Sequence, residues 1–250
     1  MRIATFGDLH LGHTRALDKF LGEEDRLLRF DDHLRQTHDR VILVGDIYQT
    51  DYGSYPGSRS DVLEAILKRY SRIARRWNAG HHSILYGNHD VITQKLMGSL
   101  KQIHLSADNW NVWLSHGHQF DPLIGDKRRR LPFVVTWMIG GLRRMGLSCF
   151  ANFLEGRLYN AGQRVSKALE LAAALALDRG RNNVIVMGHC HQVACVTAGR
   201  GVYANSGACL PDSMRYVSID TSTRVVEVRS FTRSCGTRLL MQWREEGQWM

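Results

Sequence analysis

The sequence lacks the patterns of a disulfide-stabilised, membrane-spanning or secreted protein. Its five cysteines are odd in number and show no Cys-x-x-Cys spacing, which is typical of free thiols in a reducing compartment. No apolar run approaches the roughly 18 to 20 residues of a membrane-spanning helix. The chain runs directly from Met1 into a strand-like pattern, without the basic and apolar regions of a signal peptide. We therefore expect a cytoplasmic protein.

Internal repeats and low-complexity linkers are also absent from the 250 residues. A hydrophobic fraction of 44% and a charged fraction of 23% are near globular averages, which excludes a disordered chain and a membrane bundle. Lysine and arginine number 33 against 24 acidic residues, giving a net charge of +9. This charge favours an anionic partner such as phosphate, nucleic acid or an acidic lipid surface. A basic soluble protein without such a partner is the alternative that composition leaves open.

The first half of the chain alternates strand-like apolar runs with amphipathic helical patterns, which predicts βαβ units, a parallel or mixed sheet and an α/β fold. A basic and apolar stretch at about 122–181 then predicts a helical insert within a single domain of residues 1–250. The last quarter alternates apolar and polar residues, as antiparallel strands do. The expected strands are 2–6, 41–44, 83–86, 109–114, 183–187, 193–198, 201–205, 216–219, 225–231 and 238–243, and the expected helices are 23–36, 60–77 and 161–177.

Five short polar clusters each follow an apolar strand-like run. They are Gly7-Asp8-Leu9-His10, Gly45-Asp46, Gly87-Asn88-His89-Asp90, Ser115-His116-Gly117-His118 and Gly188-His189-Cys190-His191. Because the carboxyl ends of strands in an open α/β sheet converge on one crevice, we expect these clusters to be neighbours in space. The glycines allow sharp turns and keep Cβ atoms out of the crevice.

The residue types in these clusters suit metal ligation. Asp8 and His10 are one residue apart, so both side chains can face one metal from the same side of an extended chain. His189 and His191 have the same spacing. The two oxygens of the Asp46 carboxylate suit it to bridge two cations.

Asn88 adds an amide oxygen and His116 another imidazole. Mixed imidazole and oxygen ligation suits Mn, Fe, Zn or Co better than Ca, and two such ions lie about 3.5–4 Å apart in sites of this kind. We expect two divalent ions and, among these metals, manganese. A single Asp-x-His, His-x-His or Gly-Asp fragment is more often a hydrogen-bonded turn. Turns alone do not explain five such clusters in this order, each after an apolar run. Four neighbouring residues are expected to support the ligands or to be structural: His118, Asp90, His13 and Cys190.

The ordered set Asp-x-His, Gly-Asp, Gly-Asn-His-Asp, His-Gly-His and Gly-His-x-His, over residues 8 to 191, resembles the calcineurin-like metallophosphoesterase superfamily. The resemblance implies a four-layer α-β-β-α sandwich with a dinuclear metal site at the sheet edges. It implies one metal held by Asp8, His10 and His191, a second held by Asn88, His116 and His189, and Asp46 bridging the two. It also implies that His89 contacts the phosphoryl oxygen or protonates the leaving group.

A hydrolytic mechanism follows from such ions. Metal binding can lower the pKa of a water to about 7, so that hydroxide attacks phosphorus from the side opposite the leaving group. The ions, Asn88 and His89 would stabilise the charge on the non-bridging oxygens. The sequence has no serine or cysteine nucleophile signature, so no covalent phosphoenzyme is expected.

The residues after Asp46 argue against one branch of the superfamily. Protein serine/threonine phosphatases usually carry Gly-Asp-x-x-Asp-Arg-Gly there, whereas this chain continues Ile47-Tyr48-Gln49-Thr50. A DNA-end nuclease would share residues 8–12 and the Gly-Asn-His-Asp motif, but it would usually bring a longer chain with a DNA-capping domain.

The segment 116–121, the long insert after it and the segment 202–207 resemble the UDP-2,3-diacylglucosamine pyrophosphatase group and its relatives. In that group the insert is a helical cap that shelters acyl chains and touches the membrane. Here the apolar segment 133–145 carries arginines as an interfacial helix does, and a core-packing helix is the alternative. The candidates for substrate binding are Arg128, Arg129 and Arg130. One departure is His89, where that group typically has arginine.

The expected function is hydrolysis of a phosphoester or pyrophosphate in a lipid-linked or nucleotide-linked small molecule, with an anionic membrane surface as a further partner of the insert. The alternatives are a nuclease or nucleotide phosphodiesterase, and a non-catalytic phosphate-binding scaffold.

Overall fold

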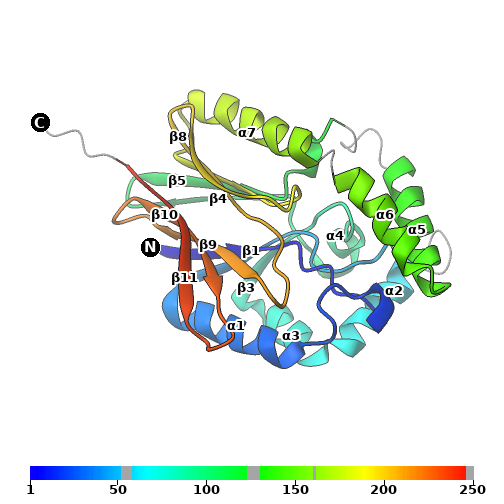
Figure 1. The fold of residues 1–250 in the computed structure, drawn as a ribbon. Coiled ribbons are helices and arrows are strands. Elements are labelled where there is room, and N and C mark those ends of the chain that lie inside the picture. The colour runs from blue at the N-terminus through cyan, green and yellow to red at the C-terminus, as the bar shows by residue number, and fades with distance from the viewer. Residues whose placement is uncertain (52–57, 123–129, 160–161, 246–250) are drawn as a thin grey trace, which may run out of the picture.

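Two β-sheets pack face to face, and helices cover their outer faces (Figure 1). The computed structural model describes residues 1–51, 58–122, 130–159 and 162–245. The six-stranded sheet has the order β11-β10-β9-β1-β2-β3 and the five-stranded sheet the order β4-β5-β6-β8-β7. The mixed α/β fold expected from the sequence is thereby confirmed.

The six-stranded sheet is parallel at one side and antiparallel at the other. Its parallel part is β1 (Arg2–Phe6), β2 (Arg40–Val44) and β3 (His82–Leu85). Its antiparallel part is β9 (Met214–Asp220), β10 (Val225–Phe231) and β11 (Thr237–Arg244). The parallel strands therefore end at one edge of the sheet, where three of the polar clusters begin.

The five-stranded sheet has three parallel strands flanked by two antiparallel ones. The parallel strands are β5 (Trp110–Ser115), β6 (Val184–Met187) and β8 (Gly201–Ser206), and the flanking strands are β4 (Gln102–Ala107) and β7 (Val193–Ala198). Ser115 pairs with Met187, so the two remaining polar clusters also start side by side.

The helices on the six-stranded sheet are α1 (Glu24–Thr37), α2 (Arg59–Arg69) and α3 (Ser71–Arg76). In α1 the residues Leu27, Phe30 and Leu34 recur at helical spacing and are buried on the sheet. The helix α7 (Gly162–Asp178) covers the five-stranded sheet in the same way. The layers therefore follow the order helix, sheet, sheet, helix.

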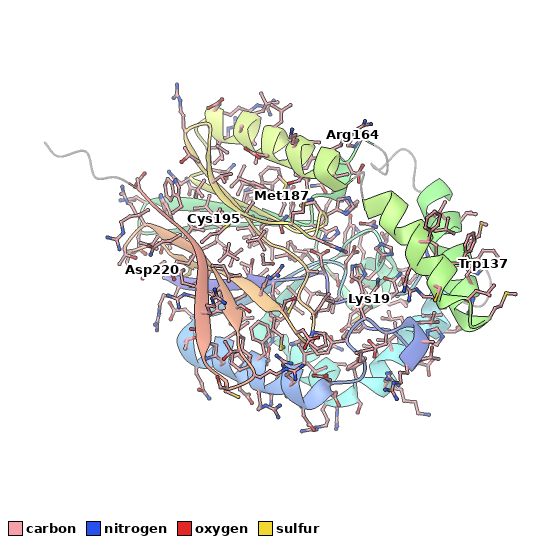
Figure 2. All side chains as sticks on the ribbon, viewed as in Figure 1. Lys19, Trp137, Arg164, Met187, Cys195 and Asp220 are labelled. Carbon is pink, nitrogen blue, oxygen red and sulfur yellow. The ribbon has the colours of Figure 1, made fainter. Side chains whose placement is uncertain are left out.

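The core between the two sheets is mainly apolar, and side chains of both sheets fill it (Figure 2). The strand β1 shows how one strand serves two cores. Ile3 points into the space between the sheets, whereas Ala4 and Phe6 belong to the cluster under the helices. This follows from the period of two along a strand.

The helices α5 (Arg130–Arg144) and α6 (Ser148–Tyr159) lie beside the sandwich and pack on each other (Figure 1). The helix α5 also contacts the short 3-10 helix η1 (Arg15–Leu17), which follows the first polar cluster. Together with α7 they form the helical part of the stretch expected at 122–181. The boundaries of that insert, and its role as a cap over the site, remain predictions. No helix among the described residues is long and apolar enough to cross a membrane.

The structure corrects three local predictions. The helix expected at 60–77 is broken at Tyr70, whose backbone leaves helical geometry (φ −107°, ψ 44°) where its buried hydroxyl donates to Asp18. The edge strand β4 and the helix α4 (Ile92–Met97) were not expected, and each is only six residues long. The last strands are not one antiparallel series, since β8 pairs in parallel with β6.

Candidate metal centre

All five polar clusters lie where the carboxyl ends of the parallel strands of the two sheets meet. Three come from the six-stranded sheet: Asp8 and His10 follow β1, Asp46 follows β2, and Asn88 and His89 follow β3. Two come from the five-stranded sheet: His116 follows β5, and His189 and His191 follow β6. The ladder continues past the strand ends, since the Asp8 N–H donates to Gly45 at 3.0 Å and the His10 N–H to Asp46 at 3.0 Å.

The side chains form three overlapping groups of metal-ligating atoms. Within each group the ligand atoms lie within 4.8 Å of one another. The groups are Asp8, His10 and His191; His10, Asp46 and His89; and Asp46, His116 and His189. Asn88 joins the last group through its Oδ1, which is 3.3 Å from His116 Nε2. The seven expected ligands are therefore brought together, and Asp46 belongs to two of the three groups.

Five of these residues have left-handed backbones: Asp8 (φ 53°), His10 (φ 49°), Asp46 (φ 51°), His189 (φ 69°) and His191 (φ 58°). Such angles are uncommon outside glycine and cluster at functional sites. The expectation of an extended chain at Asp8-x-His10 and His189-x-His191 is wrong in this respect. Asp8 and His10 converge on one group after the backbone has turned at each of them, whereas His189 and His191 contribute to different groups.

Asp8 is fully buried beneath the site. Its carboxylate accepts a hydrogen bond from the backbone N–H of His189, at 3.1 Å to Oδ2, and lies 3.5 Å from His191 Nε2. Burial acts to raise the pKa of Asp8, but the adjacent imidazoles of His191 and His116 outweigh burial and hold the pKa below its usual value. Asp8 is therefore ionised, and as a candidate ligand it also ties the β1 loop to the β6 loop.

Asp46 contacts residues of two other clusters. Its Oδ1 accepts the His89 N–H at 2.8 Å, and its Oδ2 lies 3.2 Å from His116 Nε2. Burial acts to raise the pKa of Asp46, but the charges of His116 and His89 lower it well below its ordinary value. Both oxygens of an ionised carboxylate are thus held in the middle of the donor set.

The histidines differ in the protonation that their surroundings favour. Burial lowers the pKa of His10 to about 3, which keeps the ring neutral, and His10 Nε2 lies 3.1 Å from His191 Nε2. Burial would lower the pKa of His116 as well, but the Asp46 carboxylate outweighs burial and raises the pKa to about 10. Two converging imidazole nitrogens and two buried carboxylates form a donor set that suits divalent cations.

Glycines beside the ligands allow this close packing. A Cβ on Gly87 would lie 2.1 Å from the Asp46 Oδ1, and one on Gly188 would lie 2.7 Å from the Asp8 Oδ2. Gly45, at φ 78°, would place a Cβ 2.6 Å from the His116 ring. The expectation that these glycines keep Cβ atoms away from the ligands agrees with this geometry.

Three residues near the site were not assigned to it from the sequence. Gln49 lies between His10 and His89, and its side-chain amide is within hydrogen-bond distance of both. Asp121 Oδ2 lies 2.8 Å from His189 Nε2. The Thr50 hydroxyl donates to the backbone carbonyl of His89 at 2.5 Å. The resemblance at 116–121 contained Asp121, whereas no pattern marked Gln49.

Asp90 joins two loops from behind the site. Its buried carboxylate accepts hydrogen bonds from the backbone N–H groups of Ile47 (2.7 Å), Tyr48 (3.2 Å) and Gly87 (2.6 Å). Burial, with a contribution from Asp46, raises the pKa of Asp90 to about 7. These bonds hold the β2 loop against the β3 loop, as expected of a residue that supports the ligands.

The other candidates lie further from the donor set or are not described. His118 is buried with its ring 5.4 Å from that of His116, and Cys190 is buried beside the Asn205 amide. His13 is partly exposed on the loop after β1. The proposed substrate-binding Arg128 and Arg129 lie outside the described residues, and so does the side chain of Arg130.

Residues 1–205 match the calcineurin-like phosphoesterase family. No curated protein matches the chain. Similar solved structures include a predicted phosphoesterase from Streptococcus pneumoniae (14% identity, 96% of each chain covered, TM-score 0.45). Two others are wild-type Vps29 complexed with zinc from Entamoeba histolytica (14% identity, 97% of this chain and 98% of that chain, TM-score 0.48) and the phosphoesterase Yfce from E. coli (14% identity, 97% and 98%, TM-score 0.48).

Proposed function

Because the chain belongs to the calcineurin-like phosphoesterase family, and is thus a phosphoester hydrolase, we propose that it cleaves a phosphoester or pyrophosphate bond in a lipid-linked or nucleotide-linked small molecule. The observation that carries this proposal is the position of Asp46, an ionised carboxylate shared by two of the three ligand groups, one with His10 and His89 and one with His116 and His189. A single turn or a structural ion would not need donors from five strand ends.

We propose manganese as the ion at both positions. One ion would be held by Asp8, His10 and His191, and the other by Asn88, His116 and His189, with Asp46 shared between them. When bound, such ions supply Lewis-acid chemistry, which lowers the pKa of water and offsets negative charge on a phosphoryl group. The imidazole, carboxylate and amide donors present here fit that group of metals.

His89 is proposed to act on the substrate rather than on the ions. The His89 ring is 20% exposed, whereas the His116 side chain is fully buried, so His89 is the more accessible of the two to a phosphoryl oxygen. Its backbone is fixed on both sides, since its N–H donates to Asp46 and its carbonyl accepts from Thr50. A fixed donor costs no reorganisation when charge develops on the phosphoryl oxygens, which is how such groups stabilise a transition state.

The surface of α5 and α6 supports a lipid-linked substrate and an anionic membrane surface as partner. Large apolar side chains are exposed on these helices and in the turn between them, and Arg144 is exposed among them. They are Val134, Met138, Met145, Leu147, Phe150 and Phe153. Exposed apolar groups beside cationic ones suit the boundary between headgroups and acyl chains.

Hydrolysis of bis-p-nitrophenyl phosphate by the purified protein with added manganese tests the phosphodiesterase reaction. Loss of that activity in Asp46→Asn would link it to the candidate site. No hydrolysis of any phosphoester above background by the metal-loaded protein would favour a phosphate-binding scaffold. Cleavage of DNA or RNA that disappears in Asp46→Asn would favour the nuclease alternative, to which the net charge of +9 is also suited.

A further inference from the structure

The side-chain amide of Gln49 joins two imidazoles of the candidate site. Its Oε1 lies 2.7 Å from His10 Nδ1, and its Nε2 lies 3.1 Å from His89 Nδ1. Gln49 is 2% exposed, and its backbone N–H donates to Leu11 at 2.9 Å, in the segment where Leu11 bridges to Tyr48. The backbone of Gln49, in the loop that carries Asp46, is therefore fixed against the loop that carries His10.

An amide in this position decides where the two rings carry their protons. The oxygen of a glutamine side chain only accepts hydrogen bonds, and its nitrogen only donates them. A ring nitrogen facing the oxygen must therefore carry a proton, and one facing the NH₂ group must be bare. Since both rings face Gln49 through Nδ1, one amide orientation gives His10 and His89 opposite tautomers.

Metal ligation selects one of the two orientations. The Nε2 of His10 is on the side of the ligands, 3.1 Å from His191 Nε2, and a nitrogen that binds a cation must be bare. The proton of His10 is then on Nδ1, so the Gln49 oxygen faces His10 and the NH₂ group faces His89. His89 Nδ1 is then bare, and a neutral His89 ring carries its proton on Nε2.

We propose that Gln49 is a positioning residue that holds His10 as a ligand through Nε2 and presents His89 to the substrate as an Nε2–H donor. This inference rests on the metal site proposed above. The Asp51 carboxylate is less well placed to contact His89 Nδ1, since its Oδ2 is 3.7 Å away, beyond hydrogen-bond distance. His89 thus stabilises charge on a phosphoryl oxygen by donating a hydrogen bond, without carrying a second ring proton to the reaction.

The variant Gln49→Glu tests this assignment, because a carboxylate of the same size accepts from both rings. Side-chain ¹⁵N NMR of the zinc-loaded protein, with His89 assigned from His89→Ala, reports the protonated nitrogen of each ring. In the wild type we expect His10 protonated at Nδ1 and His89 at Nε2. In Gln49→Glu we expect His10 unchanged and His89 protonated at Nδ1. A wild-type His89 already protonated at Nδ1, or a His89 unaffected by the change, would overturn the proposal.

Zinc affinity gives a second readout that does not depend on turnover. In Gln49→Leu the His10 ring loses the acceptor that orients it, so zinc affinity should fall about 10- to 100-fold, the usual effect of removing such a partner. The matched control is Gln119→Leu, whose amide donates to the Ser115 hydroxyl, and its affinity should stay within about threefold of wild type. Equal affinity in both leucine variants would count against the role at His10.

The proposed function can fail separately from this inference. A wild-type protein that takes up no zinc would refute the metal site, whereas the tautomer of His89 could still be read in the metal-free protein. A wild type that binds zinc and hydrolyses phosphodiesters, but shows no difference at His89 in Gln49→Glu, would refute only the role of Gln49.

Discussion

The carboxylate of Asp46 accepts a hydrogen bond from the backbone N–H of His89 at 2.8 Å. One side chain thereby connects the proposed shared ligand to the residue proposed to contact substrate. The two functions can be separated by mutation, because the hydrogen bond needs an acceptor oxygen and the shared ligation needs a negative charge.

Asp46→Asn should lower metal content and activity together. Asparagine keeps an oxygen that can accept the His89 N–H, but it removes the charge that offsets the repulsion between two nearby cations. Metal analysis after gel filtration, with catalysis measured on the same sample, checks this result. Two ions per chain in the variant would refute the bridging assignment.

His89→Ala should keep both ions and lose rate. Its proposed contribution is made in the transition state, so kcat should fall by about 10²–10⁴-fold, in the range found for groups that act directly on reacting atoms, while KM changes less. Kinetics with saturating manganese measure both constants. A variant with normal kcat, or one that has lost its metal, would show that the assigned role is wrong.

Gly87→Ala should displace the Asp46 carboxylate. The added methyl would lie 2.1 Å from the Asp46 Oδ1, which is closer than any real contact, so metal content should fall even though the change is a single methyl. Gly141→Ala in α5 is a matched control, since a Cβ there meets nothing within 4 Å. The control should be neutral or more stable by about 0.5–1 kcal/mol, as measured by thermal unfolding.

Asp31 should make stability depend on pH in the acid range. Burial acts to raise the pKa of Asp31, but the hydrogen-bonded His82 and Trp77 hold it below the ordinary 3.8. A lowered folded-state pKa means that the stabilisation is present above about pH 4 and is lost as the pH falls towards the folded-state value. Urea unfolding between pH 3 and 7 should show this loss.

The same pH series with Asp31→Asn should show a lower free energy of unfolding than wild type at pH 7. That free energy should also fall less than in wild type as the pH is lowered. Asp25→Asn is the control, because Asp25 pairs with Arg72 on the exposed surface, where an ion pair contributes little. An Asp31→Asn protein that loses as much stability as wild type on acidification would show that other groups dominate.

The α5–α6 surface should bind vesicles rich in anionic lipid and release them at high salt. Replacing Arg128, Arg129 and Arg130 by serine should weaken binding by about 1 kcal/mol per residue while turnover of a small soluble substrate stays nearly unchanged. Phe150→Ser with Phe153→Ser should weaken the apolar part of the same binding, since both rings are more than half exposed. Vesicle sedimentation measures both effects, and equal binding to neutral and anionic vesicles would contradict them.

The sequence was informative about the site because each ligand cluster directly follows an apolar run. The carboxyl ends of parallel strands meet at one edge of a sheet. The five clusters between residues 8 and 191 could therefore be expected to be neighbours without knowledge of the strand order. The strand limits were also readable, since the expected strands 2–6, 193–198 and 225–231 coincide with β1, β7 and β10.

The parts that could not be predicted depend on contacts between distant residues. Gln49 has no motif, and its role follows only from two rings that arrive from β1 and β3. The break at Tyr70 depends on a hydroxyl bond to Asp18, which is 52 positions away. The left-handed backbones at Asp8 and Asp46 were not predicted, although aspartate and histidine adopt this geometry more often than most other residues.

The division of the ligands between the two sheets has a consequence for the stability of the whole domain. Asp8, His10 and Asp46 come from the six-stranded sheet, whereas His116, His189 and His191 come from the five-stranded one. An ion bound as proposed joins the sheets, and its binding free energy adds to the free energy of unfolding by mass action. Chelation would therefore loosen the packing of one sheet on the other, and the metal would be part of what folds the protein as well as part of what it does.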